Sequence, residues 1–219
     1  EDEVKQLCEQ FQLDMDNTKA WYNGYLINGL HMYNPNSVSM AIERHRFDSY
    51  WKNTSSFASI NTFITMNYDG LKDDIMTMLS DGMVYVNTDT FQNDFVSISS
   101  KDEALTALIH LGYLGYNIDE KNAFVPNFEV KKAYQAALCT SGWSKVADSI
   151  SRCDELLQAT INGDSEKVAE LIEKAHDAYT SILKYNDENS LSCVLSMAYF
   201  TAPAYYNVVR EMPAGKGFA

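Results

Sequence analysis

Several common signatures of function are missing from this 219-residue sequence. It contains no GxxxxGK[ST], so the usual loop for nucleotide phosphates is absent, and the GKG at 215–217 lacks the following Ser or Thr. No GxSxG is present to indicate a serine hydrolase. No run of about 18 apolar residues occurs either, so we predict no membrane-spanning helix and no membrane partner.

Cysteine and histidine are scarce as well. The four cysteines form no CxxC pair, and the four histidines show no HExxH spacing, so we predict no metal site and no cofactor in this chain. We expect the cysteines to be buried free thiols, which is typical of a reducing cytoplasm. The first five residues, EDEVK, indicate an acidic helix rather than a signal peptide, and the missing initial Met leads us to expect an excised fragment.

Acidic residues outnumber basic ones by 30 to 17, which gives a net charge of −13. A surface that generally binds nucleic acid needs concentrated Lys and Arg, so this balance argues against one. The two densest basic positions are RHR at 44–46 and KK at 131–132. We therefore predict that any nucleic-acid contact is weak and involves Arg44, Arg46, Lys131 and Lys132; the alternative for each is a solvated helix face.

The patterning predicts an α+β fold that is mostly helical. Apolar residues make up 46% of the chain, enough for a real core. Residues 1–60 indicate a helix with apolar positions 4, 7, 8 and 11, an N-cap within 16–18, a hairpin around 22–33, and a helix over 38–44 capped by Ser37.

Residues 61–140 have a different pattern. We expect a helix over 71–79, strands over 83–86 and 95–98, a helix capped by Ser100, a hairpin of 113–118 with 123–125, and a helix after Pro126-Asn127. Helix, strand, helix, hairpin, helix is compatible with a winged-helix unit. A plain α+β packing module fits the same pattern.

Residues 141–219 begin with two helices joined by a short connection, which predicts an antiparallel helical hairpin. One has its apolar stripe over 146–157. A last helix follows, capped by Asp187, with 191, 194, 195, 198 and 199 facing inward. Residues 205–209 are β-branched and aromatic and predict a strand. Because an apolar strand with an open edge associates readily, we expect a dimer through this C-terminal strand as one outcome.

Three groups of motifs resemble a bacterial family that joins an AAA-ATPase-like domain to a PD-(D/E)XK nuclease-like domain. The first group carries WYNGY at 21–25, YNPNSV at 33–38 and YWKNTS at 50–55, similar to the family patterns WYxGY, YNPxSV and YWxxTS. The second is ALIHLGYL at 107–114 with VPNFEV at 125–130. The third is the helix that begins near Glu188, with GKGFA at 215–219.

The resemblance implies that residues 1–60 are lid helices from the C-terminal part of the ATPase-like domain. Residues 61–140 would be a winged-helix-like region, and residues 141–219 a helical hairpin with the N-terminal stub of the nuclease-like domain. The parent would bind ATP and Mg through a P-loop core that this chain lacks. The nuclease Asp and Glu-x-Lys are also absent, so we expect this chain to be inactive.

Glu188 is the one nuclease residue that the resemblance places in this chain, as an accessory acid of an incomplete catalytic site. Its alternative role is a first-turn acid favoured by the helix dipole. We therefore expect a non-catalytic fragment that couples an ATPase module to a nuclease-like domain, with the remainder of the parent as its partner. The alternative is a self-contained protein–protein interaction module.

Overall fold

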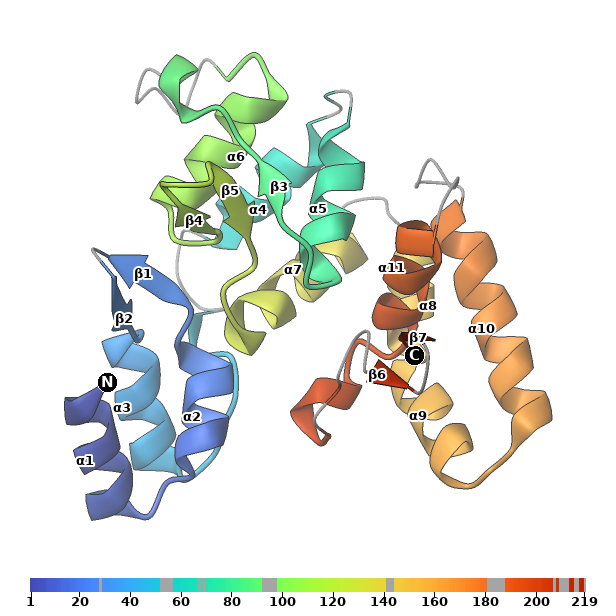
Figure 1. The fold of residues 1–219 in the computed structure, drawn as a ribbon, viewed down its shortest axis with the longest axis horizontal. Coiled ribbons are helices and arrows are strands. Elements are labelled where there is room, and N and C mark those ends of the chain that lie inside the picture. The colour runs from blue at the N-terminus through green and yellow to red at the C-terminus, as the bar shows by residue number, and fades with distance from the viewer. Residues whose placement is uncertain are drawn as a thin grey trace. The chain divides into compact units, whose positions relative to one another are not determined.

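Figure 1 shows the computed structural model of the chain. It describes residues 1–27, 29–51, 57–66, 68, 70–91, 98–140, 144–180, 188–206, 208, 213–214 and 217–218. The chain divides into two compact units, Glu1–Ala147 and Asp148–Ala219. The fold is α+β and mostly helical, as predicted. Within the described residues, no helix has the length and apolarity needed to cross a bilayer.

The first unit opens with helices α1 (Asp2–Phe11) and α2 (Met15–Tyr22), then strands β1 (Tyr25–Ile27) and β2 (Leu30–Met32), and then helix α3 (Pro35–Arg44). The two strands pair antiparallel with Ile27 opposite Leu30, which confirms the predicted hairpin. Positive φ angles of 111° at Gly24 and 78° at Gly29 explain why glycine is needed at both positions.

Two helix starts in this region differ from the prediction. Helix α2 is capped by Asp14, whose side chain accepts a hydrogen bond from the Asn17 amide, and not by a residue within 16–18. Helix α3 is capped by Asn34 and not by Ser37. The reason is that Pro35 takes the first helical position, where its fixed φ and missing N–H cost nothing.

The rest of the first unit surrounds a small sheet. Its elements are α4 (Phe57–Thr65), α5 (Leu71–Leu79), β3 (Val84–Tyr85), the 3-10 turn η2 (Thr88–Thr90), α6 (Lys101–His110), β4 (Gly115–Asn117), β5 (Asn122–Phe124) and α7 (Phe128–Thr140). The antiparallel strands lie in the order β3-β5-β4. The predicted helix over 71–79, the hairpin of 113–118 with 123–125 and the Ser100 cap are confirmed. The strand expected at 95–98 falls largely outside the described residues. Helix α7 contacts both α2 and α4.

The second unit is built around a helical hairpin. Helix α8 (Ser144–Ser151) enters it, followed by α9 (Cys153–Ile161), α10 (Ser165–Thr180) and α11 (Glu188–Ala198). The hairpin of α9 and α10 is confirmed, and Asp164 caps α10 by accepting from the Lys167 amide at 3.0 Å. The single stripe expected over 146–157 is divided between two helices, because Arg152 leaves the helical conformation with a ψ of 0°.

The inward face of α11 is confirmed at Val194 and Ala198 and differs from the prediction at Leu191 and Leu195. Leu191 and Leu195 are 43% and 36% exposed, whereas Val194, Met197 and Ala198 are buried. The buried residues follow i, i+3, i+4 spacing, so the helix is rotated about its axis relative to the expected stripe. The expected cap, Asp187, lies outside the described residues.

The strand expected at 205–209 is wrong at the positions that can be described. After the 3-10 turn η3 (Ala202–Ala204), Tyr205, Tyr206 and Val208 are not in a strand; residues 207 and 209 lie outside the described residues. The Ala202 carbonyl accepts the amides of both Tyr205 and Tyr206 at 2.9 Å, so turn bonds use the amides that a strand would offer. A short hairpin follows instead, β6 (Pro213–Ala214) with β7 (Gly217–Phe218). Dimerisation through residues 205–209 therefore stays a prediction, but Tyr205, Tyr206 and Val208 do not form the strand on which it was based.

Candidate functional site: the junction around Glu129

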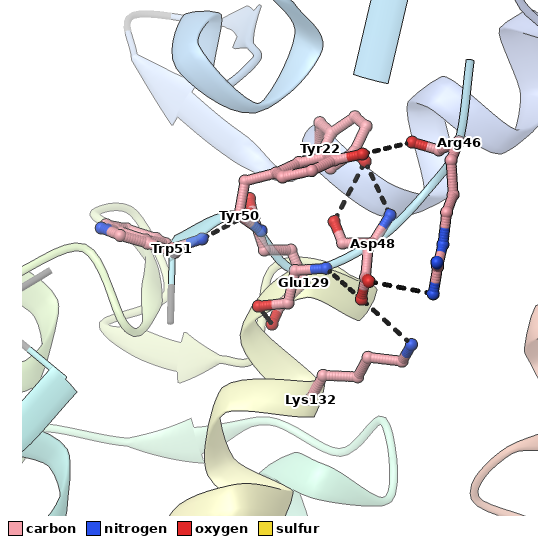
Figure 2. Close-up of polar contacts among 8 residues, drawn as sticks. Tyr22, Arg46, Asp48, Tyr50, Trp51, Glu129 and Lys132 are labelled. Carbon is pink, nitrogen blue, oxygen red and sulfur yellow. Dashed lines mark hydrogen bonds and ion pairs between the residues drawn. The ribbon is translucent and has the colours of Figure 1, made fainter. Parts of the chain in front are cut away.

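A fully buried carboxylate, Glu129, lies at the second position of α7. Its Oε1 accepts hydrogen bonds from Ser37 Oγ at 2.8 Å, from the Tyr50 amide at 2.8 Å and from the Trp51 amide at 3.1 Å. Figure 2 shows this side chain below the segment that carries Tyr50 and Trp51. The Ser49 hydroxyl also donates to the Glu129 carbonyl at 3.4 Å. One acidic residue thus ties α7 to α3 and to the chain at 49–51.

The electrostatics of Glu129 are those of a desolvated group. Burial raises the pKa of its carboxyl above the usual value, and the donors Ser37, Tyr50 and Trp51 offset part of that rise. A carboxylate that is enclosed and held by three donors is fixed in position. Its arrangement therefore favours an anchoring role over proton transfer to a ligand.

Close backbone approach joins the same two parts of the chain near Gly24. A Cβ atom added to Gly24 would lie 2.0 Å from the Pro126 carbonyl oxygen, so only glycine fits. The side-chain amide of Asn127 donates to the Asn23 carbonyl at 2.7 Å, and the Asn127 Oδ1 accepts from the Val130 amide and caps α7. This junction therefore leaves almost no room for the segments to shift.

Aromatic contacts complete the junction. Trp51 stacks on Tyr113 with ring centroids 5.1 Å apart, and Trp21 packs against Phe128 at 6.0 Å. The Tyr25 hydroxyl, whose pKa is raised by burial, donates to the Gly112 carbonyl at 2.6 Å. The described residues of the motifs at 21–25, 33–38 and 50–55 thus contact those of the motifs at 107–114 and 125–130; residues 52–55 lie outside the described part.

Sequence reasoning did not identify Glu129. The signal that could have revealed it is helical spacing, because Glu129, Ala133 and Ala137 recur every four residues and lie on one face of α7. Ala133 and Ala137 are 1% and 0% exposed. An acid on the face that buries two alanines is expected to need hydrogen-bond donors from elsewhere in the fold.

Three of the four predicted cations come together beside this junction. Arg46 and Lys132 both pair with the Asp48 carboxylate, at 3.2 and 3.6 Å, and Figure 2 shows them on either side of it. The Arg44 guanidinium lies over the Tyr50 ring, 5.5 Å from its centroid. These cations lie at the surface of α3, of the chain that follows it, and of α7.

Lys131 lies apart from the other three. Its ammonium forms an ion pair with Asp81, and its side chain is only 8% exposed. The Asp81 backbone is in the left-handed region, with φ 66°, just after the end of α5. Lys131 therefore joins α7 to the end of α5 and is not available at the surface.

Glu188 is the first residue of α11, and its side chain lies outside the described residues. Among the described residues, no group of three or more His, Cys, Asp or Glu side chains could hold a metal ion. The catalytic assignment of Glu188 therefore stays a prediction from the resemblance.

The prediction of buried free thiols is confirmed for Cys8, Cys153 and Cys193, while the side chain of Cys139 lies outside the described residues. Burial raises the pKa of the Cys153 thiol to about 11, which leaves almost no thiolate at neutral pH. The Cys153 thiol is therefore a packing group rather than a nucleophile.

The chain has also been compared with known proteins. No family model, no curated protein and no solved structure matches it.

Proposed function

We propose that this chain is a non-catalytic part of an ATPase/nuclease-like protein, in which it couples an ATPase module to a nuclease-like domain and contacts nucleic acid weakly. ATP and Mg would bind to the ATPase module of the parent. The observation that carries the proposal is the junction around Glu129, because it connects the lid-like helices at 1–51 to the region at 101–140 through buried, directional contacts.

The strand order supports a winged-helix-like identity for the middle region. In a winged-helix unit, the strand that precedes the recognition helix pairs with the second strand of the hairpin that follows that helix. The order β3-β5-β4, with α6 between β3 and the hairpin, has that arrangement. Regions of this kind often bind nucleic acid, but the first turn of α6 carries Asp102 and Glu103, and the turn after β4 carries Asp119 and Glu120. These acids repel phosphates, so we assign the region a coupling role within the protein.

The junction has the properties that coupling requires. Gly24 approaches Pro126 too closely to admit a side chain, and Glu129 requires Ser37, Tyr50 and Trp51 at fixed distances. Packed interfaces of this kind are not continuously deformable, so a displacement of one side moves the other. A change in the lid-like helices would therefore reach α7 and the sheet.

Hydrogen exchange tests this coupling with two variants of the same helix. Ser37→Ala removes a donor to Glu129, whereas Ser39→Ala removes a hydroxyl that bonds only within α3, to the Pro35 carbonyl at 2.8 Å. We expect Ser37→Ala to increase amide exchange both in α3 and at the start of α7, and Ser39→Ala to affect α3 alone. If both variants change exchange only within α3, the junction does not transmit and the proposal fails.

The reading frame of the parent gene tests the rest of the proposal. A P-loop ATPase segment before Glu1, and an Asp followed by Glu-x-Lys after Ala219, would agree with it. A reading frame without either segment would contradict it, because there would be no modules to couple.

A specific observation favours the second candidate, a protein–protein interaction module. In the β1–β2 hairpin, Ile27, Leu30 and Met32 lie on one face by the pairing register, and they are 57%, 67% and 45% exposed. Contiguous exposed apolar side chains are typical of interaction surfaces. This candidate needs no ATPase or nuclease-like module in the parent, so the reading frame of the parent gene separates the two.

A further inference from the structure

The ion pairs around Asp48 have an unusual charge balance for this acidic chain. One carboxylate serves two cations, Arg46 and Lys132, and a third cation, Arg44, is held nearby on the Tyr50 ring. Several lysine ion pairs elsewhere in the described part differ, because each group contains as many carboxylates as lysines. They are Lys19 with Glu1, Lys101 with Asp74, Lys121 with Asp89, Lys131 with Asp81, and Lys167 and Lys174 with Glu155 and Glu170.

Aromatic rings hold these cations in place. The Lys132 ammonium lies 4.7 Å from the centroid of the Trp21 ring, and the Arg44 guanidinium lies over Tyr50. The Tyr50 hydroxyl also donates to the Arg46 carbonyl at 2.6 Å, which fixes the chain between the two arginines. Cations that are already positioned lose less conformational entropy when an anion binds.

Asp48 is fixed more firmly than the cations around it. The Tyr22 hydroxyl donates to the Asp48 carbonyl at 3.1 Å and accepts from the Asp48 amide at 3.2 Å. The Asp48 carboxylate accepts in turn from the Ser49 amide at 2.8 Å. The carboxylate therefore cannot leave the cluster by a movement of its backbone, whereas the Arg46 side chain is 74% exposed and can turn toward solvent.

We propose that Arg44, Arg46 and Lys132 form a binding site for the backbone phosphates of nucleic acid, and that Asp48 is an internal competitor that keeps its affinity low. The inference rests on the nucleic-acid contact in the proposed function; it adds which three of the four predicted cations form the site, and that Asp48 restrains it. A phosphodiester carries a single negative charge and several acceptor oxygens, and can pair with these cations when they turn away from the Asp48 carboxylate.

Removal of the Asp48 charge tests the site directly. The probe is a fluorescent single-stranded oligonucleotide of about 12 nucleotides, measured by anisotropy at low ionic strength. D48N removes a charge a few ångströms from the bound phosphate and keeps an oxygen for the Ser49 amide. We expect the affinity to rise roughly three- to tenfold, the range that Coulomb's law gives for one unit charge about 3 to 6 Å away in the dielectric constant of water. The salt dependence should steepen by roughly 0.7 in log–log slope for each added phosphate contact.

The matched control is D89N, because Asp89 also pairs with one lysine, Lys121 at 3.4 Å, and its removal changes the net charge by the same amount. We expect no more than a minor gain for D89N. An equal gain for D48N and D89N, or no gain for D48N, would overturn the proposal. K132Q in the wild-type background should weaken the residual binding, and unchanged binding there would count against the site even if D48N did not fold.

Tripolyphosphate, used as a competitor of the oligonucleotide, separates two sources of phosphate. Weak competition agrees with a site that follows a nucleic-acid backbone. If D48N gains affinity for tripolyphosphate but none for the oligonucleotide, the nucleic-acid assignment is wrong. The coupling proposal is tested by hydrogen exchange in the Ser37→Ala variant, so failure of one is distinguishable from failure of the other.

Discussion

The Glu129 anchor makes a prediction about stability that two substitutions can separate. Glu129→Ala removes the acceptor for Ser37 Oγ and for the Tyr50 and Trp51 amides. A donor left without a partner in a partly buried place costs about 1 kcal/mol, so we expect a loss of about 3 kcal/mol in the free energy of unfolding. Glu129→Gln keeps an oxygen at the same place, and we expect it to remain within about 1 kcal/mol of the wild type at neutral pH.

The pH dependence distinguishes a carboxylate from any other anchor. Burial raises the pKa of Glu129 in the folded state above its unfolded value, near 4.5. Its contribution to stability is therefore complete below the unfolded pKa and is lost as the pH rises through the folded pKa, because the ionised form must then be buried. Compared with wild type, Glu129→Gln should become progressively more stable as the pH rises through that window.

Urea unfolding followed by tryptophan fluorescence measures both effects, because Trp21 and Trp51 lie in the junction. Glu103→Gln provides a control of opposite sign: hydrogen bonds from Ser99 lower the pKa of Glu103, so its contribution is lost as the pH falls. If Glu129→Ala unfolds at the same urea concentration as Glu129→Gln, the three hydrogen bonds do not stabilise the fold. If the difference between wild type and Glu129→Gln is constant with pH, the carboxylate titrates as it does in the unfolded chain.

Three further predictions concern the same unit of the fold and its chemistry. Gly24→Ala should destabilise the unit by more than about 2 kcal/mol, through its φ of 111° and the contact with Pro126, and a melting temperature close to wild type would contradict this. Lys131→Ala should lower the melting temperature by breaking the pair with Asp81 and leave oligonucleotide binding unchanged. Lys132→Gln should instead weaken oligonucleotide binding and leave the melting temperature close to that of the wild type. Calorimetry should detect no micromolar ATP binding, and incubation with Mg²⁺ or Mn²⁺ should produce no DNA cleavage; either activity would contradict the expectation that this chain is inactive.

Local chemistry predicts the elements of the first unit well, because several of them depend on residues a few positions apart. The hairpin at 22–33 follows from glycines that supply positive φ, and the helix after Pro126-Asn127 follows from an Asn cap. Local chemistry is weaker where several residues can play one part. Asn34 and Ser37 can both cap α3, and the choice of Asn34 leaves the Ser37 hydroxyl for Glu129, 92 residues away in sequence.

The predicted cation site shows that basic residues clustered in the sequence need not share a site in the fold. Lys131 and Lys132 are adjacent, but successive residues of a helix point about 100° apart. One ammonium is therefore buried against Asp81, while the other reaches Asp48 at the surface beside two arginines that are far away in sequence. A count of neighbouring charges gives both lysines the same role, and only the tertiary contacts of α7 separate them. The error at 205–209 has a similar origin, because β-branched and aromatic residues favour a strand only if their amides are not already used by a turn.

The residues that carry the family resemblance contribute mainly backbone groups, a helix cap and close packing, and not reactive side chains. Gly24 contributes the absence of a Cβ atom, Tyr50 and Trp51 contribute backbone amides, and Asn34 contributes a helix cap. Such contacts specify how two segments join, and they supply no nucleophile, acid or metal ligand. Under the proposed function, any bond-breaking chemistry would come from the ATPase module and the nuclease-like domain of the parent. A variant that breaks the junction should consequently alter communication between segments before it alters any bond-breaking step, which is the behaviour that the Ser37→Ala exchange experiment measures.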